Sequence, residues 1–113
     1  MNQRVGSLTM TAGTWPASLT TLVTRAVSLL SEADVEQRLV LILDNPTSDE
    51  SHARAAKEAL RSLVHASTLE RPELSVNLVI GGTAEDRQRT LTFLASQDGG
   101  FVRGATLDLG VAP

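Results

Sequence analysis

The run RLVLILD at residues 38–44 decides the fold of this chain. Its five central residues are all apolar, and leucine alternates there with the β-branched residues valine and isoleucine. A strand that exposes one face to water alternates apolar and polar residues, whereas an unbroken apolar run is typical of a strand buried on both faces of a parallel sheet. The sequence therefore predicts a central strand here, in a parallel sheet with helices packed on it.

Strands and helices are expected to alternate on both sides of this run. Short apolar runs predict three further strands, at residues 5–10, 74–80 and 105–111. Apolar residues at helical spacing predict helices at residues 16–33, 52–67 and 81–96. We therefore expect a single domain over residues 1–113 with an α/β, half-Rossmann-like fold in the order βαβαβαβ. Its sheet would be four-stranded and mostly parallel, with three helices and right-handed crossovers.

Two helix starts carry recognisable residues. Pro16 stands near the start of the first predicted helix, where its missing N–H costs nothing. Thr83 is the expected N-cap of the third helix, and Asp86 three residues later completes a capping-box pattern.

The composition excludes several classes of function. The chain has a net charge of −3 with scattered basic residues, so neither nucleic acid nor an anionic membrane is an expected partner. No apolar run approaches the length of a membrane span. The sequence contains no cysteine, and His52 and His65 lack metal-ligand spacing, so no metal site is expected. The N-terminus has no secretory pattern, so we expect a cytoplasmic protein.

Four segments of the chain share their order and type with one enzyme family. They are a strand at RLVLILD, a helix at ARAAKEALRSLVHAST, a strand at LSVNLVIGG, and a final helix and strand at FLASQDGGFVRGATLDLG. In this order they resemble the C-terminal half of the short-chain dehydrogenase/reductase family, over essentially the whole chain. Asn77, Gly81 and Gly82 match that family's Asn-x-x-x-Pro-Gly pattern, and Lys57 matches the Lys of its Tyr-x-x-x-Lys pair.

The chain departs from the family at the other catalytic positions. Ala53 stands where the Tyr belongs, and the chain contains no tyrosine. The position of the catalytic Ser is matched by Asp44 or its neighbours. The family's Gly-rich nucleotide-binding half would lie before residue 1, and its substrate-covering segment is missing between Gly82 and Thr83. The resemblance therefore implies a truncated, catalytically degenerate member, a pseudoenzyme that is not a self-sufficient reductase.

Lys57 and Asp44 are the candidate catalytic residues. Lys57 would contact a phosphate or carboxylate, or would be a solvated charge on its helix. Asp44 ends a central predicted strand, where α/β sheets place ligands, and would act as a base or cap the following turn. Gly81, Gly82 and Thr83 are the candidate cofactor-binding residues, with a tight strand-to-helix turn as the alternative.

Large apolar residues are the candidates for contacts between subunits. Trp15 would anchor an interface or hold the start of the first helix against the sheet. The first strand would have an unpaired edge that a partner covers, and in the family the two corresponding helices form an interface between subunits. The candidate set is Trp15, Leu22, Leu29, Leu30, Leu60, Leu63, Phe93 and Phe101.

We therefore expect a structural or regulatory subunit that oligomerises with itself or with a complete short-chain dehydrogenase-type (keto)reductase. The enzymatic alternative is a composite NAD(P)-dependent site, to which this chain adds Lys57, Asp44 and the Gly81–Gly82 turn while another chain supplies the nucleotide-binding half. A small-ligand-binding module or a cofactor-free enzyme is the third alternative. No cofactor is expected on the isolated chain, and NAD(P) only where a partner completes the site.

Overall fold

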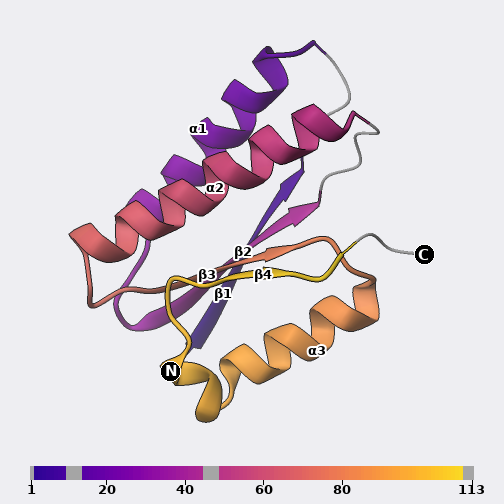
Figure 1. Ribbon diagram of the computed structural model, residues 1–113. Helices are drawn as coiled ribbons and strands as arrows, with labels where there is room; N and C mark the ends of the chain where they lie inside the picture. Colours follow the sequence, from indigo (N-terminus) through magenta and orange to yellow (C-terminus); the bar gives the residue numbers. More distant parts are fainter. Residues whose placement is uncertain (1, 10–13, 45–48, 111–113) are drawn as a thin grey trace.

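The computed structural model describes residues 2–9, 14–44 and 49–110, and its core is a parallel sheet with helices on both faces (Figure 1). Strands and helices alternate as the sequence predicts, which confirms the α/β fold class. The elements are β1 (Asn2–Thr9), α1 (Ala17–Ser31), β2 (Gln37–Asp44), α2 (Glu50–Glu70), β3 (Ser75–Ile80), α3 (Ala84–Ala95), the short 3₁₀ helix η1 (Asp98–Phe101) and β4 (Thr106–Asp108).

The four strands lie side by side in chain order, and all three pairings are parallel. β1 pairs with β2 along its whole length, from Asn2 opposite Gln37 to Thr9 opposite Asp44. β4 pairs with β3 through only three residues. In the described part of the chain, β2 and β3 are therefore interior strands, and β1 and β4 are the two edges of the sheet.

The run RLVLILD lies within β2 and fills the core on both sides of the sheet. Leu39, Leu41 and Leu43 pack with α1 and α2 in one apolar cluster. Val40 and Ile42 pack with α3 in a second cluster. None of the five is more than 7% exposed. Because successive side chains of a strand point to opposite faces, only an unbroken apolar run can supply both clusters.

The connection from β3 to β4 has the opposite hand to the two connections before it. α1 and α2 lie on one face of the sheet and α3 lies on the other (Figure 1). Because the parallel strands follow one another in order, a helix that changes face reverses the hand of its crossover. The expectation that all crossovers are right-handed is therefore wrong. Three helices on one face would leave Val40, Ile42 and Val79 open to water, and α3 covers them instead.

Among the elements whose bounds differ from the predicted ones, α2 begins before residue 52 and β4 ends before residue 111. α2 begins directly after Asp49, whose carboxylate accepts hydrogen bonds from backbone N–H groups at the helix start. β4 ends at Asp108, two residues before Gly110 adopts a positive φ of 82°. Residues 10 and 111, at the ends of two predicted strands, lie outside the described residues.

The start of α3 is the one that the sequence predicts. Thr83 Oγ1 accepts a hydrogen bond from the Asp86 N–H at 3.0 Å, and the Asp86 carboxylate accepts one from the Thr83 N–H at 3.4 Å. This reciprocal pair is a capping box, which confirms Thr83 as the N-cap.

Candidate functional site

Lys57 lines a groove of about 600 Å³ between α2 and β4, which we call the α2–β4 groove. The α2 wall also carries Glu58, Arg61 and His65, and the β4 wall carries Thr106 and Asp108. Because an α-helix turns once in 3.6 residues, residues four apart lie one above the other. The three basic side chains therefore form one stripe along α2.

Lys57 is tied to the end of β4. Its Nζ lies 3.3 Å from Asp108 Oδ2, while Asp108 Oδ1 accepts a hydrogen bond from the Gly110 N–H at 2.9 Å. The Gly110 N–H, together with the Lys57 ammonium, holds the pKa of Asp108 below its ordinary value. The Lys57 and Asp108 side chains are 39% and 48% exposed, so solvent screens the pair and it contributes little stability.

Asp44, the other candidate catalytic residue, ends β2 in an exposed position. It lies opposite Thr9 in the register of the sheet. In the described part of the chain, no hydrogen bond or ion pair joins the side chains of Asp44 and Lys57, whose ammonium pairs with Asp108. The following turn, residues 45–48, lies outside the described residues, so both interpretations of Asp44 stay predictions.

The backbone N–H groups of the Gly81–Gly82 turn are all used within the chain. The Gly81 N–H donates to the Leu43 C=O at 3.1 Å, and the Gly82 N–H donates to the Gly110 C=O at 2.9 Å. The Thr83 N–H donates to a carboxylate in the first turn of α3. A phosphate site at a helix start needs such groups to point at the ligand. This arrangement favours the tight-turn interpretation of the three candidate cofactor-binding residues.

Both positions of the turn also require glycine, for conformational and steric reasons. Gly81 and Gly82 have φ values of 68° and 78°, a region that side chains disfavour. A Cβ on Gly81 would lie 2.3 Å from the Gly110 carbonyl oxygen, and a Cβ on Gly82 would lie 2.8 Å from the Cβ of Leu109. The turn after β3 therefore interlocks with the segment that follows β4.

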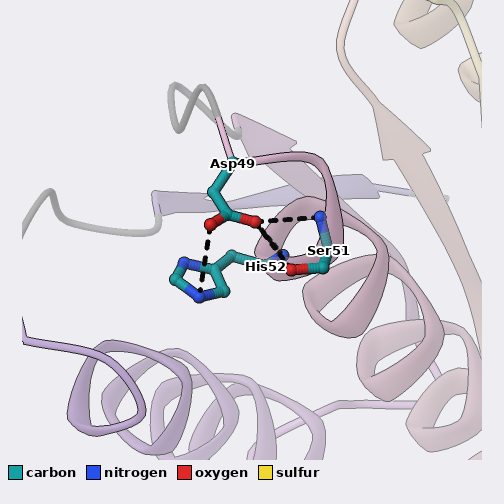
Figure 2. A network of polar contacts seen from close by, with 3 residues as sticks. All are labelled: Asp49, Ser51 and His52. Carbon is teal, nitrogen blue, oxygen red and sulfur yellow. Dashed lines mark hydrogen bonds and ion pairs between the residues drawn. The ribbon is translucent and has the colours of Figure 1, made fainter.

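Asp49, Ser51 and His52 form a polar network at the start of α2 (Figure 2). The Ser51 hydroxyl donates to Asp49 Oδ1 at 2.7 Å, and His52 Nε2 lies 3.6 Å from Asp49 Oδ2. A nucleophilic triad needs the hydroxyl to bond the imidazole, but here both groups contact the same carboxylate. Trp15 stacks on His52 with ring centroids 3.9 Å apart. The network therefore caps α2, and it favours the interpretation that Trp15 holds the start of α1 in place.

The Asp49 network should make the chain sensitive to acid. The Ser51 hydroxyl, followed by the His52 backbone N–H, holds the pKa of Asp49 below its ordinary value of 3.8. A depressed pKa in the folded state gives a stabilisation that is complete above the ordinary pKa and is lost as the pH falls through the folded-state pKa. Asp49→Asn should therefore flatten the acid side of the stability profile, measured by urea unfolding between about pH 5 and about pH 2. Because asparagine also caps helices, an unchanged acid dependence in this variant would contradict the role of the carboxylate.

The outer edge of β1 carries backbone groups that point away from the sheet. The Leu43 C=O accepts its hydrogen bond on the β3 side of β2. The N–H and C=O groups of successive residues point to opposite sides of a strand, so those of Val40 point toward β1. They bond there to the residues on either side of Val5, which lies opposite Val40. The even-numbered residues of β1 therefore face β2, and the odd-numbered ones face outward. Arg25 Nε, which reaches the Ser7 C=O at 3.4 Å from α1, agrees with this. The outward set is Gln3, Val5, Ser7 and Thr9.

A groove lies beside β1 on each face of the sheet. On the α1 side, Arg4 and residues of that helix line a groove of about 580 Å³. On the α3 side, Gln3, Val5 and residues of α3 line one of about 520 Å³. Val5 is 43% exposed. A strand added beside β1 would direct alternate side chains into these two grooves.

The candidate interface residues divide into two groups. Phe93 and Phe101 are 49% and 86% exposed, so they remain available to a partner. Much of the apolar face of the first two helices, from which the interface was expected, packs on the sheet of the same chain, while Val27 of α1 is 44% exposed. The residues that belong to this core or pack against it are Leu22, Leu29, Leu30, Leu60, Leu63 and Trp15.

Two features of the described residues, and the comparisons with known proteins, bear on function. Among residues 2–9, 14–44 and 49–110, no three His, Cys, Asp or Glu side chains are grouped as ligands of a metal ion would be. In the same described ranges, no helix has the length and apolar character that crossing a membrane requires. No protein-family model matches the chain, and no curated protein matches it. The family resemblance of the sequence therefore stays a prediction.

Proposed function

We propose that this chain is a catalytically degenerate subunit, similar to the short-chain dehydrogenase/reductase family, that acts by assembly with itself or with a complete reductase. The observation that carries the proposal is the outer edge of β1. This strand is eight residues long, and in the described part of the chain it pairs only with β2. A groove lies on each side of it. Strand addition at this edge would complete the sheet.

The composition of β1 supports pairing with another strand. Natural proteins protect edge strands by making them short or by placing charges or proline on them. The outward residues of β1, among them Val5 and Ser7, are all uncharged. The one charged residue of the strand, Arg4, pairs with Glu32 of the same chain at 3.2 Å. Apart from Arg4, and Arg25 of α1 at the Ser7 C=O, the described residues of this edge carry little of the usual protection.

The composite NAD(P) site receives no comparable support from the described contacts. Lys57 is engaged by Asp108, and the N–H groups of Gly81 and Gly82 bond to backbone carbonyls. A nucleotide would have to displace these internal partners before it met the same groups. Assembly through β1 would displace one internal contact, the hydrogen bond from Arg25 Nε to the Ser7 C=O at 3.4 Å.

Ser7→Pro is expected to abolish assembly while the chain stays folded. Proline at this outward position removes an N–H that faces away from β2, so the β1–β2 ladder keeps its hydrogen bonds. Native mass spectrometry should be run on two samples. One is the chain alone, and the other is the chain co-expressed with the nearest complete reductase from its own genome. The wild type should appear in a complex, and the variant should appear as the free chain with an unchanged circular dichroism spectrum.

Ser7→Ala is the matched control, because it keeps the N–H and should keep the complex. A complex that survives Ser7→Pro would place the interface away from β1. A wild-type chain that stays alone in both samples would overturn the assembly role itself.

A further inference from the structure

The outward backbone groups of β1 form a row that can pair with a copy of itself. Gln3 and Ser7, both outward, lie at equal distances along the strand on either side of Val5. In an antiparallel pair, opposite residues of the hydrogen-bonded kind exchange both of their N–H···O=C bonds. A second β1 laid antiparallel along the first, with Val5 opposite Val5, therefore satisfies the outward groups of both strands. Two-fold contacts of this kind are the commonest in homo-oligomers.

The side chains of β1 favour this register over the two neighbouring ones. With Val5 opposite Val5, an apolar side chain that is 43% exposed is buried against its own copy. Gln3 then lies opposite Ser7, so a polar residue faces a polar one, and Arg4 lies opposite the uncharged Gly6. One neighbouring register places Arg4 opposite Arg4, and like charges directly opposite are unfavourable. The other places Val5 opposite Ser7 and leaves the apolar side chain without an apolar partner.

The charged side chains along this edge also complement their own two-fold copies. Those that line the groove on the α1 side are Arg4, Arg25 and Glu32. Arg25 reaches the Ser7 C=O, and Glu32 pairs with Arg4. In the Val5 register, Ser7 lies beside Arg4 of the second copy, so Arg25 faces the second copy's Glu32. Each Glu32 would then lie between two arginines, and the remaining positive charge is exposed and screened by solvent.

The helices beside β1 are compatible with a second copy. The two-fold axis is perpendicular to the sheet, so the two α1 helices would lie on one face and the two α3 helices on the other. Among the described residues, none of those that line the groove on the α3 side is charged. On the α1 side the helix presents short side chains, which let two helices approach closely. These side chains are Thr20, Thr21, Thr24 and Ser28.

We propose that the partner at β1 is a second copy of this chain, paired antiparallel with Val5 opposite Val5, so that the two four-stranded sheets form one continuous sheet. The inference rests on the assembly role proposed above and names the partner for it. The Ser7 C=O, which Arg25 leaves, would accept a hydrogen bond from the Gln3 N–H of the second copy. A complete reductase at this edge is the competing outcome.

Cross-linking tests the register, because the chain contains no cysteine. Opposite residues of the hydrogen-bonded kind have Cα atoms about 5.5 Å apart, a distance that a disulfide bridges. Val5→Cys, treated with oxidised glutathione, should therefore run as a linked dimer on a non-reducing gel. Ser7→Cys is the matched control, since its two copies would lie about 14 Å apart. It should stay unlinked alone and should link when mixed with Gln3→Cys. Linking of Ser7→Cys alone, or none in the mixture, would overturn the register.

Charge variants test the same contact without a covalent bond. Val5→Lys places two ammonium groups opposite each other, and Val5→Glu places two carboxylates there. Each variant should raise the dissociation constant of the dimer by about tenfold or more, measured by sedimentation equilibrium. An equimolar mixture of the two should recover the wild-type affinity. A mixture that stays as weak as the separate variants would overturn the Val5 contact.

Native mass spectrometry distinguishes the failure of this inference from the failure of the proposed function. A complex with the co-expressed reductase that Ser7→Pro abolishes, while the chain alone stays monomeric and Val5→Cys stays unlinked, would overturn the second copy and keep the assembly role. A wild-type chain that is monomeric in both samples would overturn both.

Discussion

Gly81→Ala is expected to lower the free energy of unfolding by about 3 kcal/mol or more. Part of this loss, about 1–2 kcal/mol, is the strain of an alanine at a φ of 68°. The rest is steric, because the new Cβ would lie 2.3 Å from the Gly110 carbonyl oxygen. That atom belongs to the backbone, so it cannot rotate away as a flexible side chain would. Urea unfolding at equilibrium measures the loss.

Gly110→Ala is the matched control for this prediction. Gly110 has a similar φ of 82°, but a Cβ there would meet nothing within 4 Å. Its alanine variant should therefore lose only the strain, about 1 kcal/mol. Equal losses in the two variants would contradict the interlock between the Gly81–Gly82 turn and the segment after β4.

Asn77→Ala is expected to lower the free energy of unfolding by about 2–4 kcal/mol. Asn77 is 3% exposed and joins β3 to the segment that leads into β4. Its Nδ2 donates to the Val102 C=O at 2.9 Å, and its Oδ1 accepts from the Ala105 N–H at 3.0 Å. Alanine would leave both backbone groups without their partner in a partly buried place. Urea unfolding gives the energy, and amide chemical shifts of residues 102–108 should show the loosened segment.

Ser75→Ala is the control for Asn77→Ala. It shows whether the free energy of unfolding falls because the Asn77 hydrogen bonds are lost or because any buried polar side chain is removed. Ser75 lies on the same strand and the same face, and it is 5% exposed. Its hydroxyl has no hydrogen-bond partner among the described residues. Removing an unsatisfied buried hydroxyl should be neutral or stabilise the chain by up to about 1 kcal/mol. A loss as large as that of Asn77→Ala would contradict the assigned role of the Asn77 hydrogen bonds.

The sequence predicted the layers of this fold better than the path of the chain through them. The unbroken apolar run of β2 indicates burial on both faces, and the structure confirms it through Leu41 on one face and Val40 on the other. The same run also requires a helix on each face. It does not say which helix changes face, since all three are amphipathic. Only the finished packing assigns α3 to the second face and so reverses the hand of the last crossover.

At the candidate sites, contacts between residues close in the sequence could be predicted, whereas contacts between distant residues could not. The Thr83 N-cap could be predicted because its partner Asp86 is three residues away. The Lys57–Asp108 pair joins residues 51 positions apart, and no local pattern links them. Trp15 and His52 are also distant in sequence, so their stacking could not be distinguished beforehand from an exposed interface anchor.

The strand order leaves this chain with two sheet edges that face in opposite directions. Three strand spacings of about 4.8 Å each separate them, or about 14 Å. A strand that pairs with β1 would thus extend the sheet away from β4, so the assembly proposed above would leave the β4 edge uncovered.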